Sequence, residues 1–228
     1  MRSYRLNQFL EWSFEKEFYE ARKPIKFSAK EKKQNNISLS IAEFLTLFNA
    51  DLSEKHLDIA RDLFCFMCVT GMRYSATQNL TWKNVKSEGI FYMADKSKKD
   101  TLTPNTIYSQ KIIEKYKGND FLLPQMKMQN FNENIKQLFD KLNFDRIVEK
   151  TDFKGAKTKH QHFKLSEVIS SKLAKKTFIS LLCDAGFTSD QIGIVSANTK
   201  DTIGNYQNLN QKLIVNNASD TINNFEKM

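Results

Sequence analysis

The residues of this sequence that could bind a phosphate are mainly cations, and the first of them is Arg73. It follows Thr70-Gly71 closely, at the point where an apolar segment stops. Glycine tolerates the backbone angles that close a helix, so Arg73 would carry its charge where a buried helix ends. A cation there either pairs with the carbonyl groups of the helix end or binds an anion from outside.

Further basic residues gather in two later segments, a poorly periodic one over residues 144–164 and a helical one over about 166–185. The candidates for DNA binding or phosphate binding in these segments are Lys157, Lys159, His162, Lys172, Lys175 and Lys176. Together with Arg73 they would form one basic surface. Neutralising several phosphates is enough for an affinity for DNA that is independent of sequence and falls with salt.

The elements that would position these residues are mostly helices. Residues 63–69 are apolar almost all the way round at helical spacing, which is typical of a helix inside a core. A strand is expected to start at Trp82, and the apolar period beyond it is two, which predicts two or three antiparallel strands closed by Pro104. The predicted fold class is mainly α with a small antiparallel β-sheet.

The remaining elements follow from apolar periodicity and from turn residues. Residues 144–164 show no regular period, and Pro24 is expected to end the first helix. Helices are predicted at residues 5–23, 38–48, 54–69, 75–80, 105–116, 130–142, 166–185 and 189–195, from about 200, and weakly over 209–228.

Composition and charge bound the function. The chain has 228 residues, 40% hydrophobic and 27% charged, which is a globular composition. No apolar run reaches the roughly 18 residues of a membrane span. A net charge of +9 suits a polyanionic partner, nucleic acid before membrane surface. Cys65, Cys68 and Cys183 read as core residues in a reducing compartment, so we expect a cytoplasmic protein with no metal and no cofactor.

Two motifs carry a resemblance to a known family. Residues 70–85 read T-G-x-R-x-S-x-x-x-x-L-x-W-x-x-V, and a second motif leads from Ile192 to Tyr206. Together they resemble the tyrosine recombinases (the phage-integrase family), most closely the integrases of Bacteroides-type mobile elements, over residues 38 to about 210. The resemblance implies a tyrosine-recombinase catalytic domain that acts in DNA integration and recombination through a phosphotyrosine intermediate.

Cutting a phosphodiester without metal requires a nucleophile, cations on the phosphoryl oxygens and an acid for the leaving oxygen. The resemblance implies Tyr206 as the nucleophile and Arg73 as the first phosphate-binding cation. It places the acid at Lys96, in the turn before Pro104. The lysines that could replace Lys96 after a small register slip are Lys98 and Lys99.

The sequence departs from the family pattern at four positions. Lys172 and Lys175 stand where the family has histidine and arginine, Ala197 replaces a histidine, and Ala76 replaces a buttressing acidic residue. Lysine keeps the charge but lacks the planar fork that grips two phosphate oxygens. Each missing donor costs roughly 10²–10³ in rate. The catalytic residues expected are therefore Tyr206, Arg73, Lys96, Lys175 and Lys172, in a site where cleavage is doubtful.

The resemblance also suggests a domain organisation. Residues 1–24 resemble the last helix of a core-binding domain, residues 25–37 form a basic linker, and residues 38–228 form the catalytic-like domain. The sequence leaves open whether the chain is a fragment that lacks an N-terminal DNA-binding domain.

Three functional hypotheses remain open. The first is a recombinase that binds double-stranded DNA in a bacterial cytoplasm and self-associates on it through its C-terminal tail. The second is a catalytically inactive recombinase-like module for DNA binding or protein interaction. The third is an unrelated basic helical protein that binds RNA. None of the three involves a membrane.

Overall fold

The computed structural model describes residues 2–19, 23, 25–26, 37–93, 100–154, 157–196 and 211–225. The chain divides into two compact units. The first combines Met1–Asn35 with Thr151–His160, and the second combines Asn36–Lys150 with Gln161–Met228. Each unit is described by itself below.

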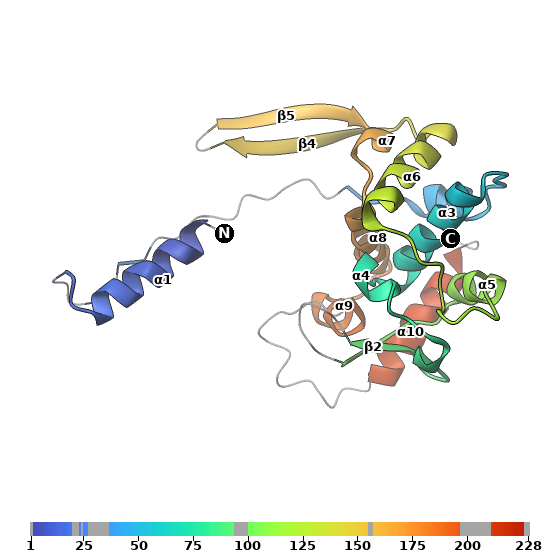
Figure 1. The fold of residues 1–228 in the computed structure, drawn as a ribbon, viewed down its shortest axis with the longest axis horizontal. Helices are drawn as coiled ribbons and strands as arrows, with labels where there is room; N and C mark the ends of the chain where they lie inside the picture. The colour runs from blue at the N-terminus through green and yellow to red at the C-terminus, as the bar shows by residue number, and fades with distance from the viewer. Residues whose placement is uncertain are drawn as a thin grey trace. The chain divides into compact units, whose positions relative to one another are not determined.

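The second unit is built around one central helix, α3 (Lys55–Thr70). The helices that pack against it include α2 (Ile41–Phe48), α5 (Ile107–Lys115), α6 (Met128–Lys141) and α8 (Ser171–Asp184) (Figure 1). The C-terminal half of α3 is buried on all sides. The prediction of a helix inside the core is confirmed, because its apolar residues meet a neighbouring helix in every direction.

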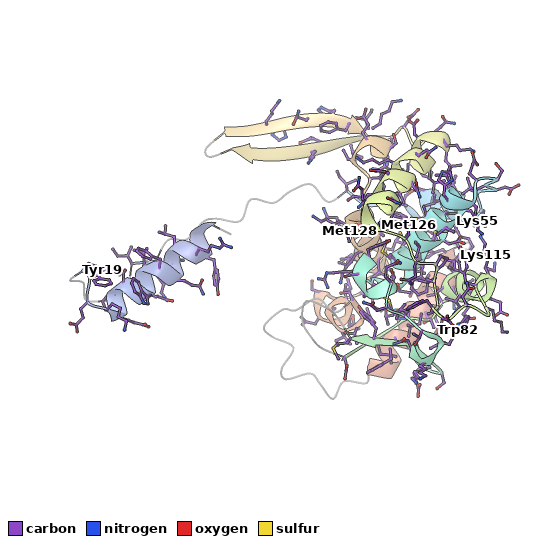
Figure 2. The ribbon with its side chains drawn as sticks, viewed as in Figure 1. Tyr19, Lys55, Trp82, Lys115, Met126 and Met128 are labelled. Carbon is purple, nitrogen blue, oxygen red and sulfur yellow. The ribbon has the colours of Figure 1, made fainter. Side chains whose placement is uncertain are left out.

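An ionic cluster fastens α3 to α5. The buried carboxylate of Asp62 accepts hydrogen bonds from Arg61 and Lys115, both at 2.8 Å, and from the hydroxyl of Tyr116 at 2.6 Å. Figure 2 labels Lys115 on α5. A buried carboxylate is tolerated when its oxygens are paired in this way. The cluster therefore fixes the N-terminal half of α3 against α5.

A three-stranded antiparallel sheet follows α3, in the order β1-β2-β3. Its strands are β1 (Val85–Lys86), β2 (Gly89–Met93) and β3 (Asp100–Thr103), with Ile90 opposite Thr103. Side chains of β2 alternate between buried and exposed, as the period of two predicted. The expected strand start at Trp82 is wrong.

Residues Trp82–Asn84 form a 3₁₀ turn instead. The side chain of Asn84 accepts a hydrogen bond from the Thr81 N–H at 2.8 Å and so caps this turn. The indole N–H of Trp82 donates to the carbonyl of Asn119 at 2.7 Å (Figure 2). The Asn84 cap holds residues 82–84 in the turn, and strand pairing begins at Val85.

A second hairpin occupies the segment that showed no period. Its strands are β4 (Ile147–Lys154) and β5 (Lys157–Lys164), joined by two residues. Residues 144–164, which show no regular period in the sequence, therefore contain two paired strands. Charged and polar residues dominate both strands, so the apolar alternation that marks a half-buried strand is missing.

The helix predicted at residues 166–185 is two helices, α7 (Leu165–Val168) and α8. Between them Ile169 has ψ 141° and Ser170 is extended (φ −159°, ψ 167°), so the helical path is broken. Gly186, in the left-handed region at φ 86°, follows the end of α8 as predicted.

The first unit contains α1 (Arg2–Glu15). The helix ends well before the predicted limit of residue 23, and Glu17 takes a positive φ of 58°. The hydroxyl of Tyr19 donates to the carbonyl of Leu10 at 3.2 Å, so the chain folds back on α1 (Figure 2 labels Tyr19). Pro24 is therefore not the residue that ends this helix.

The C-terminal part of the second unit consists of α9 (Ser189–Ser196) and α10 (Gln211–Asn223). α10 packs against α9, α5 and β3, and Phe225 beyond it contacts Phe44 and Tyr108 (ring centroids 6.0 and 6.1 Å apart). The described part of the tail, residues 211–225, thus packs on the second unit. The helix predicted from about residue 200 falls largely outside the described residues.

Candidate functional site

Arg73 stands at the junction between α3 and the short helix α4 (Tyr74–Thr77). Gly71 takes the left-handed conformation (φ 66°), and its N–H donates to the carbonyl of Met67 at 3.0 Å. The chain is extended at Arg73 (φ −83°, ψ 153°), and this residue is half-buried. The prediction that Thr70-Gly71 closes the helix is confirmed, and this closure fixes where Arg73 leaves the core.

The end of α3 lies against α8 at very short range. A Cβ atom at Gly71 would lie 2.4 Å from Cδ1 and 2.6 Å from Cε1 of Phe178, a fully buried ring. Only a residue without a side chain permits this approach. Lys175 precedes Phe178 by three residues, so both side chains leave the same side of α8. The contact therefore brings Lys175 to the end of α3 that carries Arg73.

Lys175 is half-buried, and its ammonium group donates a hydrogen bond to the backbone carbonyl of Ser196, the last residue of α9. Carbonyl groups at the C-terminal end of a helix attract a cation. Burial, and after it the nearby positive charge of Arg73, lowers the pKa of Lys175 to about 7. Near neutral pH, Lys175 therefore divides between the neutral amine and the ammonium form.

The two cations lack an acidic partner within the described residues. No ion pair or hydrogen bond to the Arg73 guanidinium occurs there, and no carboxylate contributes to the pKa of Lys175. Ala76, where the resemblance implies an acidic residue, belongs to the core and is 6% exposed. Holding two like charges together in a partly buried place costs free energy, and ionisable groups with perturbed pKa values cluster at functional sites.

Two more lysines extend this site along α8. Lys172 is exposed and Lys176 is half-buried. Lys172 lies three residues before Lys175 and four before Lys176, so the three side chains share one side of the helix. The structure thus places Arg73 near Lys175, and it places Lys172 and Lys176 on the same helix as Lys175.

The β2–β3 hairpin is fastened to the same helix end. The hydroxyl of Thr103 donates to the carbonyl of Thr70, and β3 packs against α9 and α10 (Figure 1). The turn predicted to hold the acid joins Met93 to Asp100, at the end of the hairpin opposite Thr103, and lies outside the described residues. The predicted site residues that fall outside the described residues are Lys96, Lys98, Lys99, Ala197 and Tyr206.

The candidates Lys157, Lys159 and His162 lie on strand β5. Lys159 and His162 are exposed, and of Lys157 only the backbone is described. Lys157 and Lys159 belong to the first compact unit and Arg73 to the second, so one common basic surface stays a prediction.

Sequence reasoning missed two parts of this site. One is the contact of Gly71 with Phe178, because a helix-closing glycine says nothing of its tertiary neighbours. The other is Ser196, whose carbonyl binds Lys175 and whose buried hydroxyl has no hydrogen-bond partner among the described residues. No signal in the sequence marks a backbone carbonyl as a ligand.

Two further kinds of site were searched for over the described ranges. No cluster of three or more His, Cys, Asp or Glu side chains there is arranged to hold a metal ion. No helix within these ranges combines the length and the apolar character that crossing a membrane requires.

Comparison with known proteins gives a fold but no family match by sequence. No protein-family model matches the chain, and no curated protein matches its sequence. Among solved structures, the XerH site-specific recombinase bound to difH substrate in a pre-cleavage complex matches with a TM-score of 0.54 at 11% identity. That match covers 86% of this chain and 55% of the recombinase chain.

A lambda integrase tetramer bound to a Holliday junction matches with a TM-score of 0.51 at 13% identity, over 87% of this chain and 58% of the integrase chain. The chain thus spans little more than half the length of both structures. The predicted fold class, mainly helical with a small antiparallel sheet, is confirmed. This chain therefore has the fold of a tyrosine-recombinase catalytic domain.

Proposed function

We propose that this chain binds duplex DNA as a recombinase-type protein, with a backbone phosphate held between Arg73 and Lys175. The observation that carries the proposal is the pair of adjacent cations without an acidic partner in the described residues, within a recombinase fold. A phosphate supplies the negative charge that this pair lacks. The lysines Lys172 and Lys176 would contact neighbouring phosphates of the same strand.

The motif residues support the recombinase interpretation. Arg73 follows the closure of a buried helix, as the T-G-x-R motif implies, and Lys175 stands where the family has its second arginine. We further propose that the chain acts in DNA integration or recombination of a mobile element in a bacterial cytoplasm, with Tyr206 as the nucleophile and Lys96 as the acid.

Cleavage by this site would be slow. Lys175 bonds to a helix carbonyl, and a lysine cannot form two parallel hydrogen bonds to one phosphate. Ala197 offers no donor to the phosphoryl oxygen that the family histidine would contact. The second candidate function, a recombinase-like DNA-binding module without cleavage, rests on the same substitutions and keeps the same DNA surface.

Titration of the chain with a labelled duplex at increasing salt tests this proposal. Below pH 7, where Lys175 is mostly protonated, we expect log affinity to fall linearly with log salt. Replacing Lys172, Lys175 and Lys176 together with glutamine should lower the magnitude of this slope by about 2–3, because each lost phosphate contact removes about 0.9.

A matched control replaces three exposed lysines on other surfaces, Lys55, Lys111 and Lys136, with glutamine. This triple variant has the same net charge and should keep the original slope. No duplex binding at about 50 mM salt would contradict the proposed function. An unchanged slope in the Lys172, Lys175 and Lys176 variant would place the DNA surface elsewhere on the chain.

A further inference from the structure

The β4–β5 hairpin is a separate two-stranded sheet that the three-stranded sheet does not extend. Its strands have eight residues each, so it reaches about 25 Å in length. At its base the N–H of Leu165 donates to the carbonyl of Arg146 at 2.9 Å. Farther out, Thr151 Oγ1 lies 3.4 Å from Nδ1 of His160, so these two residues face each other across the strands.

Charge is concentrated in this hairpin. Residues 146–164 contain six lysines and arginines against two acidic residues, an excess of four within nineteen residues, while the whole chain carries +9. A run of charge is often only a solvated surface. The ion pairs along the hairpin help to decide whether its charge forms a solvated surface or a binding surface.

The cations at the base are paired with acidic residues. Arg146 contacts both carboxylate oxygens of Glu43, at 2.7 and 3.2 Å, and Lys164 lies 3.0 Å from Asp145. Farther along the strands, Lys150 and Lys159 are exposed and form no ion pair with any described residue. Among the described side chains, the base is therefore anchored by ion pairs, while Lys150 and Lys159 farther out have no acidic partner.

The shape of the hairpin selects a partner. A two-stranded ribbon is marginally stable by itself, and its outer edges leave backbone groups unpaired. The major groove of B-form DNA is wide enough to accept such a ribbon, with basic side chains on the phosphates of both walls. Neighbouring side chains on β5 point to opposite faces, so Lys159 and Gln161 share one face and His160 and His162 the other.

We propose that the β4–β5 hairpin is a DNA-binding ribbon that lies in the major groove of duplex DNA. This inference rests on the proposed function for its partner, but it uses residues outside the Arg73–Lys175 site. Lys150 and Lys159 contact the phosphates beside the groove, and one face of β5 points to the base edges.

Chemical footprinting tests the proposal, with a labelled duplex of about three helical turns as the probe. Dimethyl sulfate methylates guanine at N7 in the major groove and adenine at N3 in the minor groove, so one reaction reports on both grooves. The unmodified chain should protect guanine N7. The variant Lys150→Gln/Lys159→Gln should lose that protection, bind about tenfold or more weakly, and show a salt slope lower by about two.

The matched control is Lys55→Gln/Lys111→Gln, which changes net charge equally on α3 and α5 and should keep slope and protection (Figure 2 labels Lys55). Unchanged affinity and N7 protection in the hairpin variant would overturn the inference. Protection confined to adenine N3 would do so as well, because it places the ribbon in the minor groove. Hairpin-dependent affinity that is equal for double-stranded RNA would also overturn it, since the deep, narrow major groove of RNA excludes a ribbon.

A third variant, Arg73→Gln, separates this inference from the proposed function. If Arg73→Gln loses DNA affinity and the hairpin variant keeps it, the result supports the phosphate site and contradicts the DNA-binding ribbon. The opposite pattern would support the ribbon and contradict a phosphate site at Arg73.

Discussion

Replacing Gly71 with alanine is expected to lower the free energy of unfolding by about 2–5 kcal/mol, measured by urea denaturation. Two effects add. The left-handed backbone (φ 66°) strains any residue with a side chain, and the new methyl group would lie 2.4 Å from the buried ring of Phe178. The clash would push α3 and α8 apart, so DNA affinity should also fall as Arg73 and Lys175 separate.

Gly186 provides a matched control for the strain alone. It also has a positive φ (86°), but a Cβ there would meet no atom within 4 Å. Gly186→Ala should therefore cost only the backbone strain, about 1–2 kcal/mol. Equal destabilisation by the two substitutions would contradict a close helix contact at Gly71. Adding Phe178→Leu to Gly71→Ala should recover part of the lost stability, since a smaller side chain leaves room for the methyl group.

Restoring the family residues is expected to raise strand cleavage by about 10² or more. The variant combines Lys172→His, Lys175→Arg and Ala197→His. Arginine at 175 would grip two phosphate oxygens and would keep its charge at every working pH. The measurement is the rate at which a covalent protein–DNA adduct forms on a nicked suicide duplex.

Two controls accompany this variant. Tyr206→Phe in the same background should abolish the adduct, because the phenolic oxygen is the proposed nucleophile. Moving the arginine one position along α8, with Lys176→Arg in place of Lys175→Arg, should lose most of the increase in the rate of adduct formation. Robust adduct formation by the unmodified chain would contradict the view that the substituted site is slow.

The part of the fold that the sequence predicts is the part with a local cause. α3 is recognisable because its residues are apolar in every direction, and its end because Gly71 follows directly on the last residue. The alternation along β2 could be read because one face of that strand packs on the core. In each case the signal lies within a window of a few residues.

The elements that the sequence analysis missed have causes that a window of a few residues does not reveal. β4 and β5 pair with each other and are rich in charged residues, so no apolar face reveals them. α1 ends at Glu15, and beyond it the chain folds back so that Tyr19 bonds to Leu10, although Lys16 and Glu17 are good helix formers. The break between α7 and α8 had a usable signal in Ser170, since serine is a favoured N-cap residue.

The candidate site shows the same division. The position of Arg73 just after α3 and that of Lys175 on α8 follow from sequence spacing, whereas their proximity depends on Gly71 lying against Phe178. The contact of Lys175 with the carbonyl of Ser196 joins residues twenty-one positions apart through a backbone atom. Side-chain patterns carry no information on such an acceptor.

The pH dependence of DNA affinity, compared between the unmodified chain and Lys175→Arg, tests the phosphate site most directly. In the free protein, burial and the charge of Arg73 hold the pKa of Lys175 at about 7. A bound phosphate favours the ammonium form and raises this pKa. Above pH 7, binding therefore takes up a proton, and affinity should fall by up to about tenfold per pH unit.

Arginine stays charged over this whole range, so the affinity of Lys175→Arg should lack this fall. Both proteins share His160 and His162, and the difference between their pH profiles isolates position 175. A fall in affinity above pH 7 that is present in the unmodified chain and absent in Lys175→Arg is the result we predict. Identical profiles for the two proteins would contradict a DNA phosphate at Arg73 and Lys175.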